Sequence, residues 1–366
     1  MKTAIIHYWL INMRGGEKML EALLEMFPDA DIFTHVYKPT AVSPLINGHR
    51  IITSGINRLP FAKKLYRFYM PLMPRALLDF NLQSYNLVIS SEAGPAKGVV
   101  PNPNAFHLCY CHSPMRYLWD MYHEYLGSSN LLVKFFMKRL IPSLRVWDIS
   151  SANLVDRFVT NSNYVAKRIQ RIYNRSAEVV FGPASIERFA SVERKPEDFY
   201  LFFGEVVGYK RADIAIDACL KSNRKLIVAG AGAKKLERKY RNSSLVSFKG
   251  RITDEELREL YAAARALLFP GIEDLGLVPI EANAAGCPVI AFRDGGALDT
   301  VKEDVTGIFF NEQTPSSLIK AIGRFEAMEA EGTFKNREAF TDHVQQFSPE
   351  AFKERIKKII AERKRV

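Results

Sequence analysis

The chain has 366 residues, of which 48% are hydrophobic and 25% are charged, so it is long enough for two domains that each bury a core. This composition excludes small disulfide scaffolds and disordered or fibrous chains. No segment approaches the roughly 18 consecutive apolar residues of a membrane-spanning helix. We expect residues 3–9 to form a buried strand, not a secretory signal. The four cysteines show no framework spacing, which indicates reduced thiols in the cytoplasm.

The net charge of +11 is concentrated in one half of the chain. Residues 1–180 hold 21 Lys and Arg against 12 Asp and Glu, and residues 181–366 hold 30 against 28, so the halves carry +9 and +2. This asymmetry indicates that the N-terminal half meets an anionic partner: a membrane surface, a nucleic acid or a phosphorylated substrate.

Short apolar runs alternate with helical patterns along the whole chain, which is typical of parallel α/β sheets. In the first half, strands are predicted at 3–9, 85–91, 105–111, 157–161 and 177–181. In the second half, they are predicted at 199–204, 225–230, 245–250, 266–270, 288–292 and 307–310.

Two doubly wound, Rossmann-like parallel-sheet domains follow from this order, facing a central cleft that binds the ligands. The polar segment 191–199 indicates an interdomain linker. We therefore predict one domain over 1–190 and a second domain over 191–345. Residues 346–366 are predicted to form a C-terminal helix that packs back on the first domain.

A glycine pair follows the first predicted strand. After Asn12, the residues Gly15 and Gly16 open a helix, where free backbone amides and the positive end of the helix dipole attract anions. A tight left-handed turn without a ligand explains the same pair equally well.

The segment 106–120 combines a strand with a polar loop. His107, Cys109 and Cys111 share one strand face, but a fourth zinc ligand at matching spacing is missing, so we expect core packing there. His112 follows the strand, and Arg116 and Tyr117 form a cationic and aromatic group that suits sugar hydroxyls or phosphate. An ordinary surface loop is the alternative.

Two further motifs lie in the second half. Lys210 and Arg211 stand between a strand and a helix, where they bind phosphate or simply begin a solvated helix. In residues 270–291, Glu273 and Glu281 flank a turn formed by Leu275, Gly276 and Leu277, and a helix starts beyond it. Its amides form a diphosphate cradle, and carboxylates accept hydrogen bonds from vicinal hydroxyls.

The chain resembles the family 4 retaining glycosyltransferases of the GT-B fold, and most of all bacterial O-antigen and exopolysaccharide mannosyltransferases. The resemblance covers nearly the whole chain. It is carried by GGEKML (15–20), YCHSPMRYLWD (110–120), DRFVTNSNYVAKRIQRIY (156–173), YKRADIAIDA (209–218), GRITDEELRELYAAARALLFP (250–270) and the two glutamates with seven residues between them.

The resemblance implies that the domain over 1–190 binds the acceptor and that the domain over 191–345 binds the nucleotide sugar. It also implies a role for each motif. Glu281 binds the ribose of the donor nucleotide, Glu273 binds the donor hexose, and Lys210 neutralises the diphosphate. The amides around Gly276 and Leu277 hold sugar and phosphate, and Arg251 lies in the segment that cups the base. His112 contacts the transferred sugar, and Gly15 and Gly16 lie beside the diphosphate and the acceptor.

One position departs from the family pattern. Most relatives have arginine after the glycine of the phosphate loop, where this chain has Glu205 after Gly204. That arginine supplies the second phosphate cation, so Arg211 is the candidate to replace it.

The implied reaction is retaining, metal-independent hexose transfer without a further cofactor, with GDP-mannose as the expected donor and a lipid-diphosphate-linked saccharide of cell-surface polysaccharide synthesis as the acceptor. The alternatives are a UDP-sugar-dependent transferase, a nucleotide-sugar epimerase and a non-catalytic nucleotide-sugar-binding subunit. No nucleic-acid-binding motif is present.

Two acid-free segments indicate peripheral binding to an anionic membrane, on the inner face of the plasma membrane. Residues 56–75 contain five Lys and Arg, and residues 131–147 contain four, each among large apolar side chains. Amphipathic helices that pack on their own sheet are the alternative.

Overall fold

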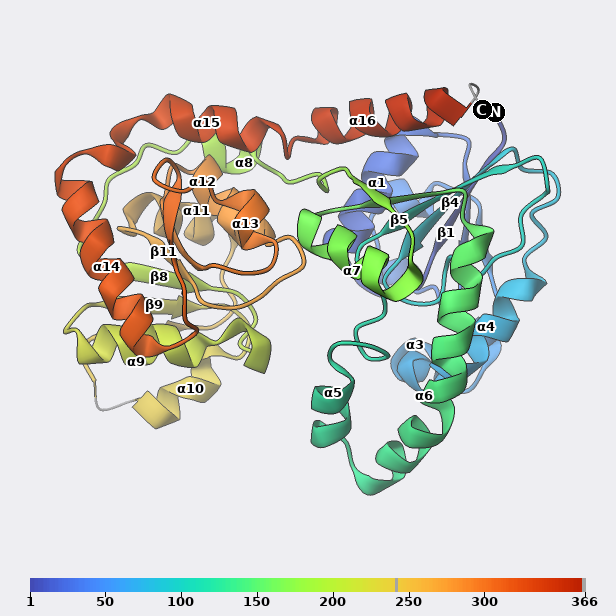
Figure 1. The fold of residues 1–366 in the computed structure, drawn as a ribbon, viewed down its shortest axis with the longest axis horizontal. Coiled ribbons are helices and arrows are strands. Elements are labelled where there is room, and N and C mark those ends of the chain that lie inside the picture. Colours follow the sequence, from blue (N-terminus) through green and yellow to red (C-terminus); the bar gives the residue numbers. More distant parts are fainter. Residues whose placement is uncertain (241–242, 364–366) are drawn as a thin grey trace. The chain divides into compact units, whose positions relative to one another are not determined.

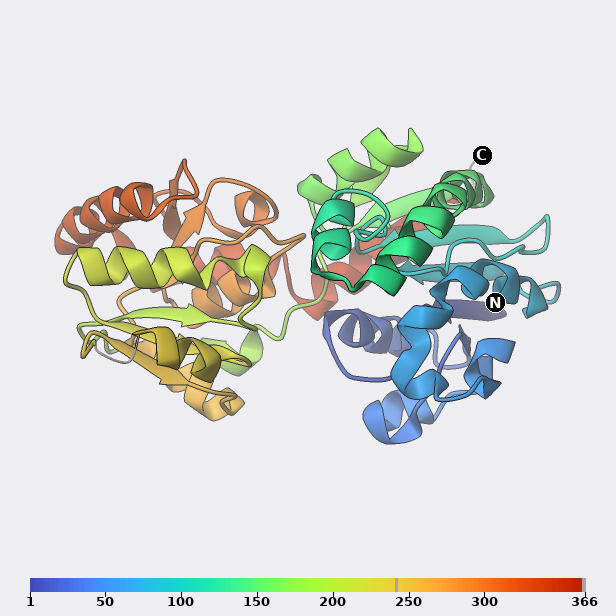
Figure 2. The same ribbon diagram turned by 90° about the horizontal axis from the view of Figure 1, so that it is seen from below.

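The computed structural model describes residues 1–240 and 243–363 and divides them into two compact units (Figure 1). The first unit comprises residues 1–181 together with the C-terminal residues from 353 onward, and the second comprises 182–352. Each unit is built on one parallel sheet, and helices cover both faces of each sheet (Figures 1 and 2). The predicted fold class is confirmed.

The sheet of the first unit has seven strands in the order β3-β2-β1-β4-β5-β6-β7. They are β1 (Thr3–His7), β2 (Asp31–Thr34), β3 (Ile51–Thr53), β4 (Leu87–Glu92), β5 (Phe106–Cys111), β6 (Arg157–Thr160) and β7 (Ala177–Val179). The central strands β1 and β4 are buried at every residue, because helices cover both faces of a parallel sheet.

The sheet of the second unit has six strands in the order β10-β9-β8-β11-β12-β13. They are β8 (Tyr200–Phe203), β9 (Leu226–Ala229), β10 (Val246–Lys249), β11 (Leu267–Phe269), β12 (Val289–Phe292) and β13 (Gly307–Phe310). All six were predicted. In both sheets the strand order reverses beside the first strand of the unit, and ligands of such folds bind at the carboxyl ends of the strands there.

Helices connect successive strands, and those after residue 310 follow the last strand. The α-helices are α1 (Gly15–Met26), α2 (Pro44–Asn47), α3 (Ala62–Leu65), α4 (Met73–Ala76), α5 (Tyr122–Ser128), α6 (Leu131–Ser151), α7 (Asn163–Tyr173), α8 (Glu187–Ala190), α9 (Ala212–Lys221), α10 (Ala233–Tyr240), α11 (Asp254–Ala263), α12 (Leu277–Ala284), α13 (Ala297–Thr300), α14 (Pro315–Ala330), α15 (Arg337–Gln345) and α16 (Pro349–Glu362). Short 3-10 helices are η1 (Pro39–Ala41), η2 (Gly55–Arg58), η3 (Tyr66–Leu72), η4 (Leu77–Asp79), η5 (Ala152–Leu154), η6 (Gly208–Lys210) and η7 (Thr333–Lys335).

Residues 191–199, which were predicted as a linker, run along the second unit. The backbone amide of Lys195 donates to the carbonyl of Ala262, and the amide of Glu197 donates to that of Ala263. Most of α16 belongs to the first unit, where Lys353 pairs with Glu25 at 2.5 Å.

The two acid-free segments differ in secondary structure. Residues 56–75 form consecutive short turns of helix, because prolines interrupt them at 60, 71 and 74. Residues 131–147 belong to the 21-residue helix α6, which continues through Pro142. None of the described helices is both long enough and apolar enough to cross a bilayer.

Candidate active site

The ends of β8 and β11 bring a lysine and a glutamate together in the second unit. Lys210 ends the turn η6 after β8, and Glu273 lies in the loop after β11. The Lys210 ammonium is 2.9 Å from the Glu273 carboxylate, and their side chains are 15% and 18% exposed. Burial lowers the pKa of Lys210, but the charge and hydrogen bond of Glu273 raise it by more, so its pKa lies above the ordinary lysine value. Lys210 is therefore a permanent cation at neutral pH.

Glycines allow the two loops to approach each other. A Cβ atom at Gly271 would lie 2.7 Å from the Cα atom of Lys210. Gly204 has a φ of +145°, and a Cβ atom there would lie 3.0 Å from the Lys210 ammonium. The space around Lys210 therefore depends on residues without side chains.

The helix α12 begins directly after this loop. Its N-cap is Gly276, with a φ of +86°, and no side chain caps the helix start. Leu275 is buried and Leu277 is half-buried. The first amides of α12 therefore have no side-chain cap, which is the arrangement in which a helix N-terminus binds an anion.

Glu281 lies one turn further along α12, where the hydroxyl of Tyr261 donates to its carboxylate at 3.5 Å. Burial, and then the charge of Glu281, raise the pKa of Tyr261 well above its ordinary value. The tyrosine thus stays a neutral donor that orients the carboxylate.

The guanidinium of Arg211, a predicted donor-site cation, has other partners. The Arg211 guanidinium donates to the carboxylate of Asp213 and to the side-chain oxygen of Gln313 at 3.1 Å. Arg251 is exposed after β10. Glu205 is exposed, and its charge helps to raise the pKa of Lys210 after the larger effects of burial and Glu273. The charges of two carboxylates, Glu273 and Glu205, therefore act on Lys210.

A second glycine pair also belongs to this region, and the motif reading missed it. The amide of Gly296 donates to the carbonyl of Glu273 at 2.8 Å, and a Cβ atom at Gly295 would lie 2.8 Å from the same oxygen. The only available signal was the Gly-Gly pair shortly after the strand β12.

In the first unit, Gly15 and Gly16 begin α1 with helical backbone angles. The alternative of a left-handed turn is therefore wrong. A Cβ atom at Gly16 would lie 2.4 Å from the hydroxyl of Tyr8, so close packing alone requires this glycine. The half-buried Asn12 precedes the helix in the same loop.

His112 follows β5 and is half-buried. Its Nε2 atom is 3.0 Å from the hydroxyl of Ser91 in β4. Burial, and then the charge of His7, lower the pKa of His112 to about 3, so its ring is neutral at physiological pH. Motif reading found His112 but missed Ser91 and His7, which come from other strands.

Side chains of the loop after His112 contact one another. The Arg116 guanidinium lies 3.7 Å from Asp120, and the Tyr117 hydroxyl donates to the sulfur of Met115 at 2.7 Å. Burial raises the pKa of Tyr117 well above its ordinary value.

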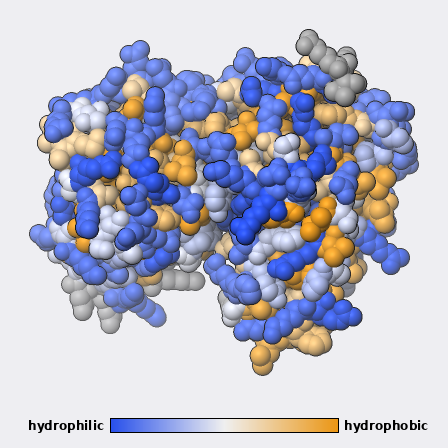
Figure 3. Space-filling model, viewed as in Figure 1, coloured by the Kyte–Doolittle hydropathy of each residue, from blue (hydrophilic) through white to orange (hydrophobic). Residues whose placement is uncertain are grey.

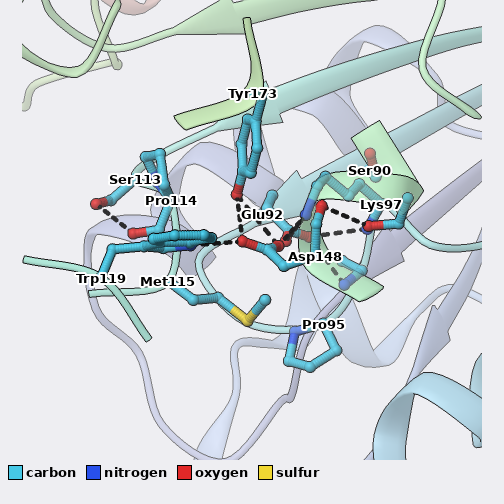
Figure 4. A network of polar contacts seen from close by, with 12 residues as sticks. Ser90, Glu92, Pro95, Lys97, Ser113, Pro114, Met115, Trp119, Asp148 and Tyr173 are labelled. Carbon is cyan, nitrogen blue, oxygen red and sulfur yellow. Dashed lines mark hydrogen bonds and ion pairs between the residues drawn. The ribbon is translucent and has the colours of Figure 1, made fainter. Parts of the chain in front are cut away.

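A buried ionic network lies under this loop (Figure 4). Lys97 pairs with Glu92 at 3.2 Å and with Asp148, and all three side chains are fully buried. The Asp148 carboxylate also accepts hydrogen bonds from Trp119 at 2.8 Å and from Tyr173 at 3.0 Å. The network therefore ties the end of β4, the helix α6 and the loop of Trp119 together.

The possible zinc cluster has other partners. His107 bonds to the hydroxyl of Ser90 at 2.9 Å and to the carbonyl of Leu154 at 2.7 Å, and Cys109 and Cys111 are buried thiols in the core. Within residues 1–240 and 243–363, no group of three His, Cys, Asp or Glu side chains is arranged to hold a metal ion.

The comparisons with known proteins agree with the fold. The chain is similar to a sucrose-phosphate synthase structure from Thermosynechococcus elongatus, with 19% identity, coverage of 99% of both chains and a TM-score of 0.71. It is also similar to the Anabaena protein HepE in complex with UDP, with 15% identity, coverage of 99% and 100%, and a TM-score of 0.70. Two parallel-sheet units with such structural relatives define the GT-B fold.

The family comparison concerns the second unit. Residues 184–347 match the family described as Glycosyl transferases group 1. A D-inositol 3-phosphate glycosyltransferase from Streptomyces bingchenggensis is 28% identical over 206 residues, which are 47% of this chain and 45% of that protein. The chain thus spans about half the length of this relative. The match to the group 1 glycosyltransferases therefore lies within the second unit.

Proposed function

We propose that this protein is a retaining glycosyltransferase that moves a hexose from a nucleoside diphosphate to a hydroxyl group of a lipid-linked saccharide. The observation that carries the proposal is the Lys210–Glu273 pair, which lies beside the uncapped start of α12, with Glu281 one turn further along the helix. A cation and free amides suit a diphosphate, and carboxylates suit the hydroxyls of two sugars.

Each residue then has one role in donor binding. Lys210 and the amides at Gly276 and Leu277 stabilise the charge that develops on the leaving diphosphate. Glu281, oriented by Tyr261, accepts from the ribose hydroxyls. Glu273 holds the hexose and forms an ion pair with Lys210.

The donor phosphate takes the acceptor proton on the face from which it departs, so the configuration at the anomeric carbon is retained. Double displacement would need a carboxylate nucleophile about 5 Å from an acid, and the proposal assigns no such residue. Lys210 and α12 supply the charge stabilisation, so turnover should persist in a metal chelator.

GDP-mannose is the proposed donor, on the strength of the resemblance over residues 109–120 and 209–218. The main competitor is a UDP-hexose, since the HepE structure of similar fold contains UDP. A non-catalytic nucleotide-sugar-binding subunit remains the second candidate, because Glu205 stands where relatives carry a cation.

The proposed acceptor is carried by an anionic lipid leaflet on the cytoplasmic face of the plasma membrane, to which the first unit binds. Phe61 and Phe68 are 74% and 67% exposed, and Leu131 and Phe135 of α6 are 85% and 64% exposed. Figure 3 shows hydrophobic side chains at the surface over α6. Neither 56–75 nor 131–147 contains an acidic residue, so the charge of both segments suits anionic headgroups.

A thermal-shift screen with GDP-mannose, UDP-glucose, ADP-glucose and dTDP-glucose tests the donor. A ligand that binds only the native state raises the melting temperature, and we expect GDP-mannose to do so. Stabilisation by UDP-glucose alone would overturn the choice of donor. Turnover with a lipid-linked acceptor separates an enzyme from a binding subunit, and product analysis with donor alone detects an epimerase.

A further inference from the structure

Arg211 follows Lys210 and has a left-handed backbone conformation. Its φ is +52° and its ψ is +43°, and the helix α9 begins at the next residue. In the part of the chain that the structure describes, five residues other than glycine have a positive φ, and three of them are Asn or Asp. Asn and Asp tolerate this conformation, whereas an arginine gains nothing from it. Contacts of the Arg211 side chain therefore have to hold the turn.

The Arg211 side chain takes part in a hydrogen-bonded bridge between loops. Its Nη1 atom donates to the side-chain oxygen of Gln313 at 3.1 Å, and the Gln313 side-chain nitrogen donates to the carbonyl of Pro270 at 2.9 Å. The Nη2 and Nε atoms of the guanidinium donate to the carboxylate of Asp213 at 3.0 and 3.1 Å. Gln313 lies after β13, and Pro270 directly follows β11. The bridge therefore connects the loops after β8, β11 and β13.

The donors and acceptors of this bridge allow one arrangement. A guanidinium only donates and stays charged at physiological pH, and a backbone carbonyl only accepts. The side-chain amide of Gln313 lies between these two groups, so it must turn its oxygen towards Arg211 and its nitrogen towards Pro270. The hydrogen-bond pattern of the bridge is therefore the same over the whole physiological pH range.

The bridge ends beside the Lys210–Glu273 ion pair. Arg211 directly follows Lys210 in the chain, and Pro270 lies three residues before Glu273. At Gly271, between Pro270 and Glu273, a Cβ atom would lie 2.7 Å from the Cα atom of Lys210. Both loops that carry the ion pair are thus fixed by the bridge at points close to the paired residues.

We propose that Arg211 and Gln313 are positioning residues that hold the Lys210 ammonium against the Glu273 carboxylate, and that Arg211 does not bind the diphosphate itself. The inference rests on the proposed function in taking Lys210 as the cation that stabilises the leaving diphosphate. It goes further in giving Arg211 a different role from that of a phosphate cation. The guanidinium binds a carboxylate and a carboxamide, so it acts on the reaction through Lys210.

An arginine at the end of β12 provides a matched control. The Nε atom of Arg293 donates to the side-chain oxygen of Asn311 at 2.9 Å, and its Nη2 atom pairs with the carboxylate of Glu303. Arg293 thus also binds a carboxamide and a carboxylate. Its partners lie on either side of β13, so replacing Arg293 by Ala should leave the bridge intact.

Nitrogen-15 NMR of the lysine ammonium groups in the full chain tests the bridge without a ligand. An ammonium group in a persistent ion pair exchanges its protons slowly enough to be observed in cooled, slightly acidic solution, and the Lys210 signal is assigned by its loss in Lys210→Arg. The signal should disappear in Glu273→Gln, which breaks the pair directly. It should also disappear in Arg211→Gly and in Gln313→Leu, and it should persist in Arg293→Ala.

The choice of glycine separates the side chain of Arg211 from its backbone. Glycine adopts a positive φ without strain, so Arg211→Gly keeps the turn and removes the guanidinium. An unchanged Lys210 signal in Arg211→Gly or in Gln313→Leu would overturn the inference, and so would its loss in Arg293→Ala.

The second readout is kcat/KM for hexose transfer. Arg211→Gly and Gln313→Leu should each lose roughly tenfold, the contribution of one charge-assisted hydrogen bond. The double variant should lose no more than either single variant, because both residues act through one bridge. Arg293→Ala should stay near the parent.

A larger loss in Arg211→Gly than in Gln313→Leu, with additive losses in the double variant, would show that the guanidinium binds the phosphate itself and would overturn the inference. An equal loss in Arg293→Ala would assign the effect to the stability of the sheet edge and would overturn it as well. If no donor is turned over at all, the proposed function fails, and the Lys210 signal still decides whether the bridge positions this lysine.

Discussion

The ammonium group of Lys210 lies 2.9 Å from the carboxylate of Glu273, although the two residues are far apart in the sequence. They meet because β8 and β11 are neighbours in the sheet and both strands end at the same edge. The pair keeps a cation and a carboxylate side by side in a partly buried position. This arrangement suits a sugar diphosphate, because its phosphates bind a cation and its hydroxyls donate hydrogen bonds to a carboxylate.

Lys210→Ala and Glu281→Ala should each remove most of the turnover while leaving the fold intact. Loss of one charge-assisted contact to the diphosphate or to the ribose costs about 1.5 to 3 kcal/mol, or roughly 10- to 150-fold in kcat/KM. Steady-state kinetics and thermal melting measure the two effects separately.

Lys225→Ala is the control for Lys210→Ala. Lys225 is exposed in the same unit and makes a long ion pair of 3.7 Å with Asp198, so its loss should alter neither turnover nor melting. Near-parental turnover in both site variants, with parental melting, would show that the donor site is elsewhere.

The first unit should lose stability as the pH falls from about 6.5 to 4. Burial lowers the pKa of His35 to about 4, and it does the same to His107. Their pKa in the unfolded chain is about 6.5, so in this window the unfolded state binds more protons than the folded state. Each histidine then reduces the free energy of unfolding by roughly 1.4 kcal/mol per pH unit.

Tryptophan fluorescence during urea denaturation isolates this effect, since all three tryptophans, Trp9, Trp119 and Trp147, lie in the first unit. His35→Gln should flatten the pH dependence, and His123→Gln, at an exposed position, should leave it unchanged. If the free energy of unfolding depends equally on pH in both variants, the loss of stability does not come from the buried His35.

Lys97→Met should destabilise the first unit strongly. The change leaves Glu92 and Asp148 fully buried without their cation, and breaking a buried pair in this way costs about 3 to 5 kcal/mol. The same fluorescence assay measures it, and Lys63→Met, at an exposed position, is the control. A loss below about 1 kcal/mol would mean that the network contributes little to stability.

The strands of the second unit were predictable because each is a short, buried apolar run that helical segments separate from the next. The strands β2 and β3 were missed in the first unit. β2 has four residues and begins with Asp31, and β3 has three half-buried residues at the edge of the sheet. Runs of three or four residues are too short to show an alternation of apolar and polar side chains. These strands are stabilised by pairing with their neighbours, β2 with β1 and β3 with β2.

The same limit applies to the candidate site. Glu273, Gly276 and Glu281 were found because they lie close together in the sequence. His7 and Ser91 were not found, because their contact arises from the register of two strands that are 84 residues apart. Register is set by packing across the whole sheet, and a local motif does not contain it.

The first unit should bind vesicles that contain anionic lipid, and binding should fall as salt rises. Lys63, Lys64 and Arg67 are exposed beside Phe61 and Phe68. Each cation near an anionic surface contributes about 1 kcal/mol, so replacing all three by Glu should weaken binding by roughly a hundredfold or more. Co-sedimentation of the full chain with vesicles measures this.

A second triple variant separates this surface from net charge alone. Lys18, Lys167 and Arg171 are also exposed in the first unit but lie outside the two acid-free segments. Replacing them by Glu changes the net charge by the same amount, three times −2, from +11 to +5. If the acid-free segments form the docking surface, this variant should keep most of its binding. Equal weakening in both triples would indicate only diffuse attraction, and parental binding to neutral vesicles would exclude electrostatic docking altogether.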